Sequence, residues 1–403
     1  MLLGILIAAL AIGGLYVRRL APDERVDLYH RVLATVRHAR PTFAEPAPEF
    51  KAFVEMLRQR TRRAVVTPAL LGLNGAIFVV MLFGSGALSA PGTLIDWGGS
   101  FGPRTTNGEW WRLVTAMFVH SGPLHLAADV AGLLWMGFLL ERLVGPVAFA
   151  ATYLTAGMLV GTADLSTHEA AVHVGASGAI FGIYGLFAAL MISGLVTRSK
   201  AMIPLSALKI VAPGAAVFLL YDLVAFGDGE ARFVGFAAGL ASGLLLAMGL
   251  AERKPPARRI ATVAIASLVI AVTWAAPIRG LSDATTLIGQ VVAAEHRTAR
   301  DYDTARDRFN AGRGTMKERI DLIERIRPEL QALRAQVQSV GKVPREQQLL
   351  LANAIEYLKT RDESWRMRAE ALRKGDMRML READRMEQVS LNAFGKIGPA
   401  GVQ

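Results

Sequence analysis

The sequence predicts an all-α protein that crosses a membrane several times. Its 403 residues are 52% hydrophobic and have a mean hydropathy of +0.34, which is more apolar than an ordinary soluble chain. The apolar residues occur in long blocks rather than periodic stripes, as is typical of membrane-spanning helices. The Lys and Arg residues behind the net charge of +11 cluster between these blocks. This distribution indicates membrane topology rather than nucleic-acid binding.

Eight segments are apolar and long enough to span a bilayer. They cover residues 1–17, 65–84, 113–140, 146–163, 177–195, 207–226, 233–250 and 260–277. Basic residues fall on alternate connections between them, and the positive-inside rule places those connections in the cytoplasm. We therefore expect an integral, multi-pass membrane protein with both termini outside, in a bacterial inner (plasma) membrane.

The N-terminal segment, residues 1–17, has no basic residue before its apolar run and two arginines directly after it. A secretory signal peptide has the opposite arrangement, so an uncleaved membrane anchor is favoured over a cleaved signal. Residues 18–64 are charged and are expected to form a cytoplasmic linker. The core is predicted at 65–250, and residues 251–277 supply a cytoplasmic loop and one further span.

The C-terminal part, residues 278–403, is polar and mixed in charge. Its apolar residues recur at spacings of three and four, as in an amphipathic helix: Met316, Ile320, Ile323, Ile326, Leu330, Leu333, Val337 and Val340. Residues 341–344 break this pattern, a second one follows, and Gly375-Asp376 ends that. An extracytoplasmic soluble helical bundle or antiparallel hairpin is predicted. Residues 280–403 would bind a protein partner or self-associate, with a simple spacer as the alternative.

The motif Gly175-Ala176-Ser177-Gly178 opens one of the long apolar helices. A serine between small residues at a helix start has backbone N–H groups directed at whatever binds there. Upstream lie the strings WGGSFGPRTTNGEWWRL, TAMFVH and HLAAD, and the serine motif continues as GASGAIFG. Over about residues 65–250, these motifs resemble the rhomboid family of intramembrane serine proteases. The resemblance implies a rhomboid-like six-helix core, here with one extra span on each side.

The resemblance also implies roles for individual residues. Ser177 matches the nucleophile, and its own N–H contributes to the oxyanion hole. His125 matches the histidine that donates there, and His120 sits where some rhomboids have another. Phe181, one turn beyond the serine, matches the aromatic residue that packs against the catalytic base.

Asp129 departs from the family pattern one helical turn after His125. The family usually has an asparagine there, as a second oxyanion donor. An ionised carboxylate accepts hydrogen bonds and cannot donate them. We therefore expect Asp129 to repel the oxyanion that it should stabilise.

The base position departs further. Rhomboids carry a histidine in a pattern like Ala-His-x-x-Gly-x-x-x-Gly, and the matching run here, residues 231–239, has Arg232 in its place. A register slipped by four would put Phe236 there, and no histidine lies between Ser177 and His296. Arginine stays protonated and cannot act as a general base.

Two helices carry stripes of small residues that let helices in lipid approach closely. One stripe is Gly178, Gly182 and Gly185, and the other is Gly235, Gly239 and Gly243. In rhomboids these two helices pack together and carry the serine and its base. The same packing is expected here.

Arg232 and Asp129 are opposite charges in positions that face one cavity in the family. One hypothesis is an ion pair between them across the catalytic centre, since unpaired charges in a membrane are costly. The alternative is that Arg232 pairs with Asp222 or Glu230, or snorkels to the interface. His173, four residues before the serine, is a candidate substitute base that would reach the hydroxyl through a water, and His168 lies nearby. Nothing in the sequence orients either histidine.

The preferred functional reading is a pseudoprotease that binds transmembrane segments of client proteins without cutting them. An active serine endopeptidase with a non-standard base is the first alternative, and a membrane anchor for the C-terminal domain is the second. No cofactor, metal site or nucleic-acid partner is expected, and the lack of cysteines excludes thiolate ligands.

Overall fold

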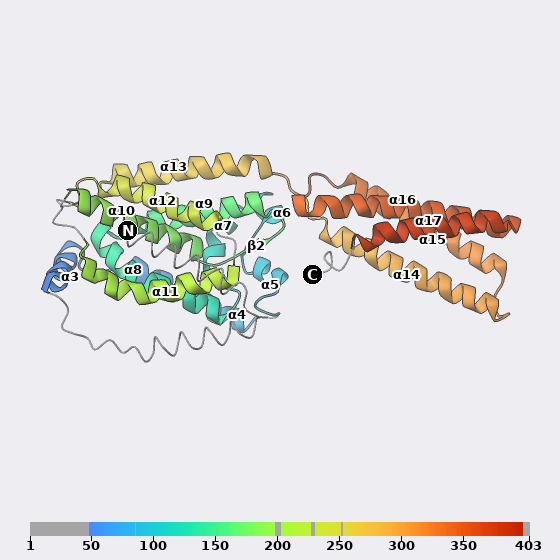
Figure 1. Ribbon diagram of the computed structural model, residues 1–403, viewed down its shortest axis with the longest axis horizontal. Coiled ribbons are helices and arrows are strands. Elements are labelled where there is room, and N and C mark those ends of the chain that lie inside the picture. The colour runs from blue at the N-terminus through green and yellow to red at the C-terminus, as the bar shows by residue number, and fades with distance from the viewer. Residues whose placement is uncertain (1–47, 85, 198–202, 227–229, 251–252, 398–403) are drawn as a thin grey trace. The chain divides into compact units, whose positions relative to one another are not determined.

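The computed structural model describes residues 48–84, 86–197, 203–226, 230–250 and 253–397 (Figure 1). It is all-α apart from one pair of two-residue strands, which confirms the predicted fold class. The predicted anchor at 1–17 and most of the linker lie outside the described residues. The chain divides into two compact units, and each is described by itself.

The first unit takes residues 1–101, 108–167 and 171–278. Its short elements are α3 (Pro48–Arg60), α5 (Pro91–Asp96), α7 (Arg112–Thr115), η1 (Ala116–Phe118) and η2 (Ala276–Ile278), with strands β1 (Ser100–Phe101) and β2 (Val172–His173). Its long helices are α4 (Val66–Leu82), α8 (Pro123–Val144), α9 (Pro146–Thr167), α10 (Ser177–Thr197), α11 (Leu205–Phe226), α12 (Glu230–Ala247) and α13 (Ala257–Ala275). The two strands pair antiparallel, with Ser100 opposite His173.

Among the described residues, five helices are long and apolar enough to cross a membrane: α8, α9, α10, α11 and α13 with η2. Helices α4 and α12 are apolar but shorter. The span predicted at 113–140 begins too early, because residues 112–118 form only α7 and η1 and the long helix starts at Pro123. Proline lacks a backbone N–H and suits the first turn of a helix, so α8 begins there.

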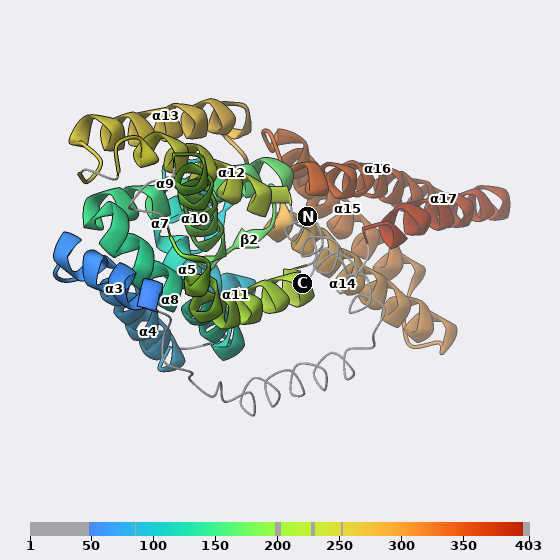
Figure 2. The same ribbon diagram turned by 60° about the vertical axis from the view of Figure 1, so that its left-hand side comes forward.

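Helix α10 lies at the centre of this unit, with α8, α9 and α12 packed around it (Figure 2). The predicted glycine stripes do meet. A Cβ on Gly239 would lie 1.8 Å from the Gly182 carbonyl oxygen, and one on Gly235 would lie 2.5 Å from that of Gly178. The backbones of α10 and α12 are therefore in direct contact, which fixes the depth of one helix against the other.

Helix α4 is held by a buried carboxylate on α8. Glu141, with no exposed surface, accepts the backbone N–H groups of Val65, Val66 and Thr67 at 2.6, 2.8 and 2.7 Å. These N–H groups have no partner within the helix, so one carboxylate satisfies three of them.

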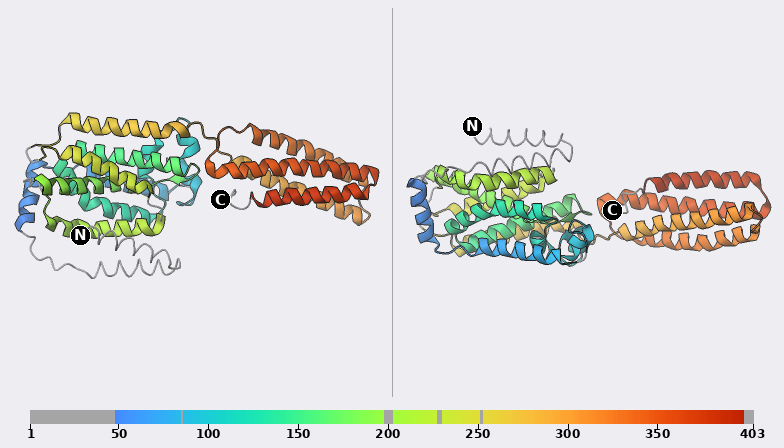
Figure 3. Two further views of the ribbon diagram at one scale, coloured as in Figure 1. Left: turned by 45° about the horizontal axis from the view of Figure 1, so that its top comes forward. Right: turned by 90° about the horizontal axis from the view of Figure 1, so that it is seen from below.

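The second unit contains residues 102–107, with α6 (Gly102–Thr105), 168–170 and 279–403. Four helices lie alongside one another in it: α14 (Thr285–Asn310), α15 (Met316–Ser339), α16 (Arg345–Lys374) and α17 (Met377–Gly395) (Figure 3). The predicted apolar stripe of α15 is buried at Ile323, Ile326, Leu330, Leu333 and Val337. Gly375 adopts a left-handed conformation, φ +65°, and ends α16 as the sequence indicates.

Candidate active site

Ser177 is the first residue of α10, and the turn before it depends on Gly175. Gly175 has φ +105°, and a Cβ there would lie 2.4 Å from His125 Nε2. Its N–H donates to the Ala116 carbonyl oxygen at 2.9 Å. Glycine is therefore required both by the backbone conformation and by the close approach of the histidine. The result is a serine at a helix N-terminus, held beside the N-terminal part of α8.

Asp129 is buried and holds the residue next to the serine. Its Oδ2 accepts the Ala176 N–H at 2.8 Å and lies 3.1 Å from His120 Nε2 and 3.8 Å from His125 Nε2. The sequence suggested an acid facing the oxyanion site, whereas the structure surrounds this oxygen with nitrogen atoms. Asp129 therefore positions the serine turn through a backbone N–H.

His120 lies between two oxygen atoms. Its Nδ1 is 3.3 Å from the Phe118 carbonyl oxygen, and its Nε2 is 3.1 Å from Asp129 Oδ2. His120 and Asp129 are both buried, so each provides the other with a polar partner out of contact with solvent.

His125 is buried and is directed at the serine turn by its neighbours. Its Nδ1 lies 3.2 Å from the Ser121 hydroxyl, and its ring stacks on Tyr221 of α11 with centroids 5.9 Å apart. The His120 ring meets it edge-on at 5.0 Å. The side chain that the sequence predicts as an oxyanion donor thus lies against Gly175, two residues before Ser177.

Arg232 pairs with Asp222 and not with Asp129. Its Nε lies 2.8 Å from Asp222 Oδ2, and the two side chains are 15% and 5% exposed. The proposed Asp129–Arg232 bridge is therefore wrong, and the alternative partner is the one the structure shows. The physical reason is local: Asp222 and Arg232 lie near the consecutive ends of α11 and α12, ten positions apart in the sequence, and Asp129 is already satisfied by His120 and Ala176.

Phe181 occupies the space between α10, α11 and α12. Its ring lies 5.2 Å from that of Phe218 and 6.3 Å, edge-on, from that of Tyr184. A Cβ on Gly235 would lie 3.4 Å from the Phe181 Cβ. Arg232 lies about one turn before Gly235 on α12, so it stands at the level of the serine end of α10.

Comparison of this chain with known proteins identifies its family. Residues 107–253 match the model of the Rhomboid domain. A 153-residue stretch is 32% identical to the "Putative rhomboid protease YdcA" of Bacillus subtilis and covers 37% of this chain and 71% of that protein. This chain belongs to the rhomboid family. The "Rhomboid-type serine protease 2" of Emericella nidulans is 32% identical over 36% of this chain and 29% of its own length. The "RHOMBOID-like protein 5" of Arabidopsis thaliana is 33% identical over 34% and 45%.

This rhomboid-family chain also has a second histidine near its serine, and the structure gives that histidine an acidic partner. His173 Nδ1 lies 3.6 Å from Asp164 Oδ2 on α9. Both residues and Ser177 line one cavity of about 50 Å³, together with Gly157 and Val160. The sequence reasoning found His173 but missed Asp164. The available signal was an acidic residue near the end of an apolar helix, nine positions before the histidine.

Tyr221 was also missed. It precedes Asp222 in an otherwise apolar run, and a polar pair in such a run is the signal that could have placed this part of α11 at the site.

Proposed function

We propose that this rhomboid-family protein binds transmembrane segments in the bilayer without hydrolysing them, as a pseudoprotease. The observation that carries the proposal is Arg232. It occupies the position of the family's base histidine, and Asp222 holds its guanidinium at 2.8 Å. A guanidinium stays protonated and cannot remove the proton of the Ser177 hydroxyl, so the nucleophile has no base on α12.

The surroundings of Arg232 support binding without chemistry. The glycine contacts between α10 and α12 are close, and Phe181 packs between three helices, so the inherited cavity keeps its walls. Asp129 accepts the Ala176 N–H, and a carboxylate in that role offers no donor to an oxyanion. The helices around the serine thus remain closely packed, while Arg232 and Asp129 stand where the family has a base and an oxyanion donor.

Reaction of the full-length protein with a fluorophosphonate tests the proposal, because that probe needs an activated serine. We expect no more labelling, and no faster cleavage of a generic rhomboid transmembrane substrate, than with Ser177→Ala. Photocrosslinking should meanwhile show the substrate bound to both proteins equally. Cleavage that depends on Ser177 would contradict the proposal.

A second candidate function is an active intramembrane endopeptidase that uses His173 as base. The Asp164–His173 contact favours it, because a carboxylate that orients a histidine is the usual support for a general base. The shared cavity of about 50 Å³ is large enough for one water between His173 and Ser177. Cleavage lost in His173→Ala and reduced in Asp164→Asn, but unchanged in His168→Ala, would establish this candidate and remove the first.

We propose that both termini lie outside the bacterial inner membrane and that residues 280–403 bind a protein partner there. The support is the alternation of basic connections along the sequence. Because the chain has no cysteine, single cysteines at Ser199, Pro256 and Ser282 can each be probed alone. In intact cells an impermeant reagent should label only the one at Ser282, and the reverse pattern would invert the topology.

The alternative role, a membrane anchor for the C-terminal unit, is separated by deletion of residues 280–403. A pseudoprotease should keep crosslinking to transmembrane segments after the deletion. An anchor should lose every measurable interaction.

A further inference from the structure

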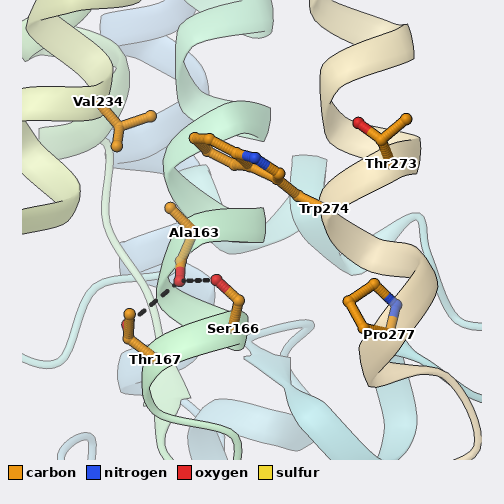
Figure 4. A pocket seen from close by; sticks show the side chains of 7 residues that line it. All are labelled: Ala163, Ser166, Thr167, Val234, Thr273, Trp274 and Pro277. Atoms are coloured by element: carbon orange, nitrogen blue, oxygen red, sulfur yellow. Dashed lines mark hydrogen bonds between the residues drawn. The ribbon is translucent and has the colours of Figure 1, made fainter.

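A pocket of about 380 Å³ lies between α9, α12 and α13, and Ser177 is not among its lining residues (Figure 4). Its lining residues are Ala163, Ser166, Thr167, Val234, Thr273, Trp274 and Pro277. Trp274 projects from α13 toward α9 above Ala163 (Figure 4). Helix α13 packs along α9 but touches α12 little, so the pocket follows the seam where α12 and α13 separate.

The polar side-chain groups that line this pocket are three hydroxyls and the indole N–H of Trp274. The Ser166 hydroxyl donates to the Ala163 carbonyl at 2.7 Å, as does that of Thr167 at 3.2 Å. The Thr273 hydroxyl donates to the Ile270 carbonyl at 2.8 Å. The three hydroxyl protons are therefore used internally, so these hydroxyls offer oxygen lone pairs to a ligand, whereas Trp274 offers its indole N–H. The seven lining residues include no Lys, Arg, Asp or Glu.

The position of the pocket indicates that it opens toward lipid. Six lining residues belong to the apolar spans 146–167 and 257–278. Thr273 and Trp274 lie at the end of α13 opposite Arg258 and Arg259. Neighbouring α13 side chains such as Ile265, Val269 and Val272 are about half exposed, which is the pattern of a lipid-facing helix. A tryptophan at the end of a span is typical of the membrane interface, where hydrocarbon meets headgroups.

We propose that this pocket binds one acyl chain of a glycerophospholipid, with the headgroup at the hydroxyls of Ser166, Thr167 and Thr273. A volume of about 380 Å³ equals roughly a dozen water-sized volumes of ~30 Å³, which fits part of a chain. A transmembrane helix, ~10 Å or more in diameter, is too wide. The acceptors and the absence of lining cations select an ammonium headgroup, as in phosphatidylethanolamine, over an anionic one. The proposal is independent of whether Ser177 reacts.

Native mass spectrometry of the full-length protein tests the proposal, after incubation in detergent with phosphatidylethanolamine or phosphatidylglycerol. Ala163→Phe fills the pocket, and Ala266→Phe adds the same ring to an exposed face of α13. Wild type and Ala266→Phe should retain one phosphatidylethanolamine. Ala163→Phe should bind it at least about tenfold more weakly, the effect of excluding roughly two methylene groups.

Thr273→Val keeps the shape of the pocket and removes one acceptor. It should reduce the preference for phosphatidylethanolamine over phosphatidylglycerol while a lipid is still retained. If Ala163→Phe does not fold, this variant and Trp274→Ala decide the question. Equal retention of both lipids by every variant would show only bulk lipid and overturn the proposal. Loss of self-association instead of lipid in Ala163→Phe would also overturn it, in favour of a second copy of the chain.

Discussion

The membrane unit and the C-terminal unit bury charge in different ways. Around Ser177, each buried carboxylate has a small set of partners: Asp129 has two histidines and one backbone N–H, and Asp222 has one arginine. The C-terminal unit instead joins several buried charges in one network around Arg361. In the membrane unit, glycine lets helices pack closely, and each buried charge has its own few partners. In the C-terminal bundle, long side chains both fill the space between helices and pair the buried charges.

Arg361 is the centre of the bundle network. Its guanidinium makes two hydrogen bonds to Glu295, at 3.0 and 2.9 Å, and one to Glu387 at 2.6 Å. Tyr357 donates to the same Glu295 carboxylate, and the Arg361 guanidinium lies 4.6 Å from the Trp365 ring centroid. Burial lowers the pKa of Arg361, but Glu295 and Glu387 outweigh burial and raise it. Burial has the opposite effect on the Tyr357 hydroxyl, because it raises the pKa of an acidic group, and the neighbouring Glu295 raises that pKa further.

The largest expected effect is in this network. Arg361→Met leaves Glu295 buried without its cation, which should lower the free energy of unfolding by about 3–5 kcal/mol. The control is Arg297→Met, which breaks the exposed pair with Glu329 and should cost less than about 1 kcal/mol. Hydrogen exchange of the bundle amides in the full-length protein measures both. Equal effects would mean that the buried network is no more important than a surface pair.

The second effect belongs to the glycine contacts. Gly239→Ala places a methyl group against the Gly182 carbonyl, a backbone atom that cannot rotate away, so a loss of about 1–3 kcal/mol or more is expected. Gly72→Ala on α4 is the matched control, since nothing lies within 4 Å of its added Cβ. Detergent melting temperatures compare the two. A Gly239→Ala protein as stable as Gly72→Ala would show that α10 and α12 can separate at little cost.

The contrast between the units also explains what the sequence could predict. Long apolar blocks and glycine stripes report directly on spans and their contacts, so the helices of the membrane unit and the α10–α12 packing were predictable. Residues 113–122 are apolar too, and composition alone does not distinguish a loop helix such as α7 from the start of a span. In the bundle, α14 was not predicted, because its buried residues Ile288, Val291 and Ala294 are spread through a polar sequence.

Sequence reasoning named several residues that lie close together in the structure, but it did not give the contacts between them. Ser177, His125 and Asp129 do lie together around the serine turn. Their hydrogen-bond partners depend on how the helices pack, which the spacing of residues in the sequence does not give. The sequence suggested Arg232 on α12 as the partner of Asp129, whereas the structure places His120, His125 and the Ala176 N–H next to its carboxylate. The Asp164–His173 contact joins two elements across a loop and was invisible for the same reason.

The third prediction tests the choice of partner for Arg232. Asp222→Asn and Arg232→Gln should each cost about 1–3 kcal/mol, since each leaves a largely buried group without its partner. The double variant should cost less than the sum, because neither orphaned charge remains. Asp129→Asn combined with Arg232→Gln provides the control pair and should be additive. The melting temperatures of the five variants measure these losses. If the losses of Asp129→Asn and Arg232→Gln are non-additive while those of Asp222→Asn and Arg232→Gln are additive, Arg232 is paired with Asp129 and not with Asp222.

The smallest expected effect is at an exposed helix cap in the bundle. The Asp376 carboxylate accepts the N–H groups of Arg378 and Met379 at 2.8 and 3.1 Å, and hydrogen bonds to Met379 and Arg378 lower its pKa. Its folded pKa lies below the unfolded value of about 3.9, so the stabilisation is complete above that value and is lost as pH falls through the folded pKa. Asn also caps helices well but does not titrate. Exchange of the first amides of α17 should therefore accelerate in wild type relative to Asp376→Asn when the pH is lowered from 6 to 3, each pair being compared at one pH. A ratio that does not change with pH would show that the charge of Asp376 contributes nothing beyond the acceptor that Asn supplies.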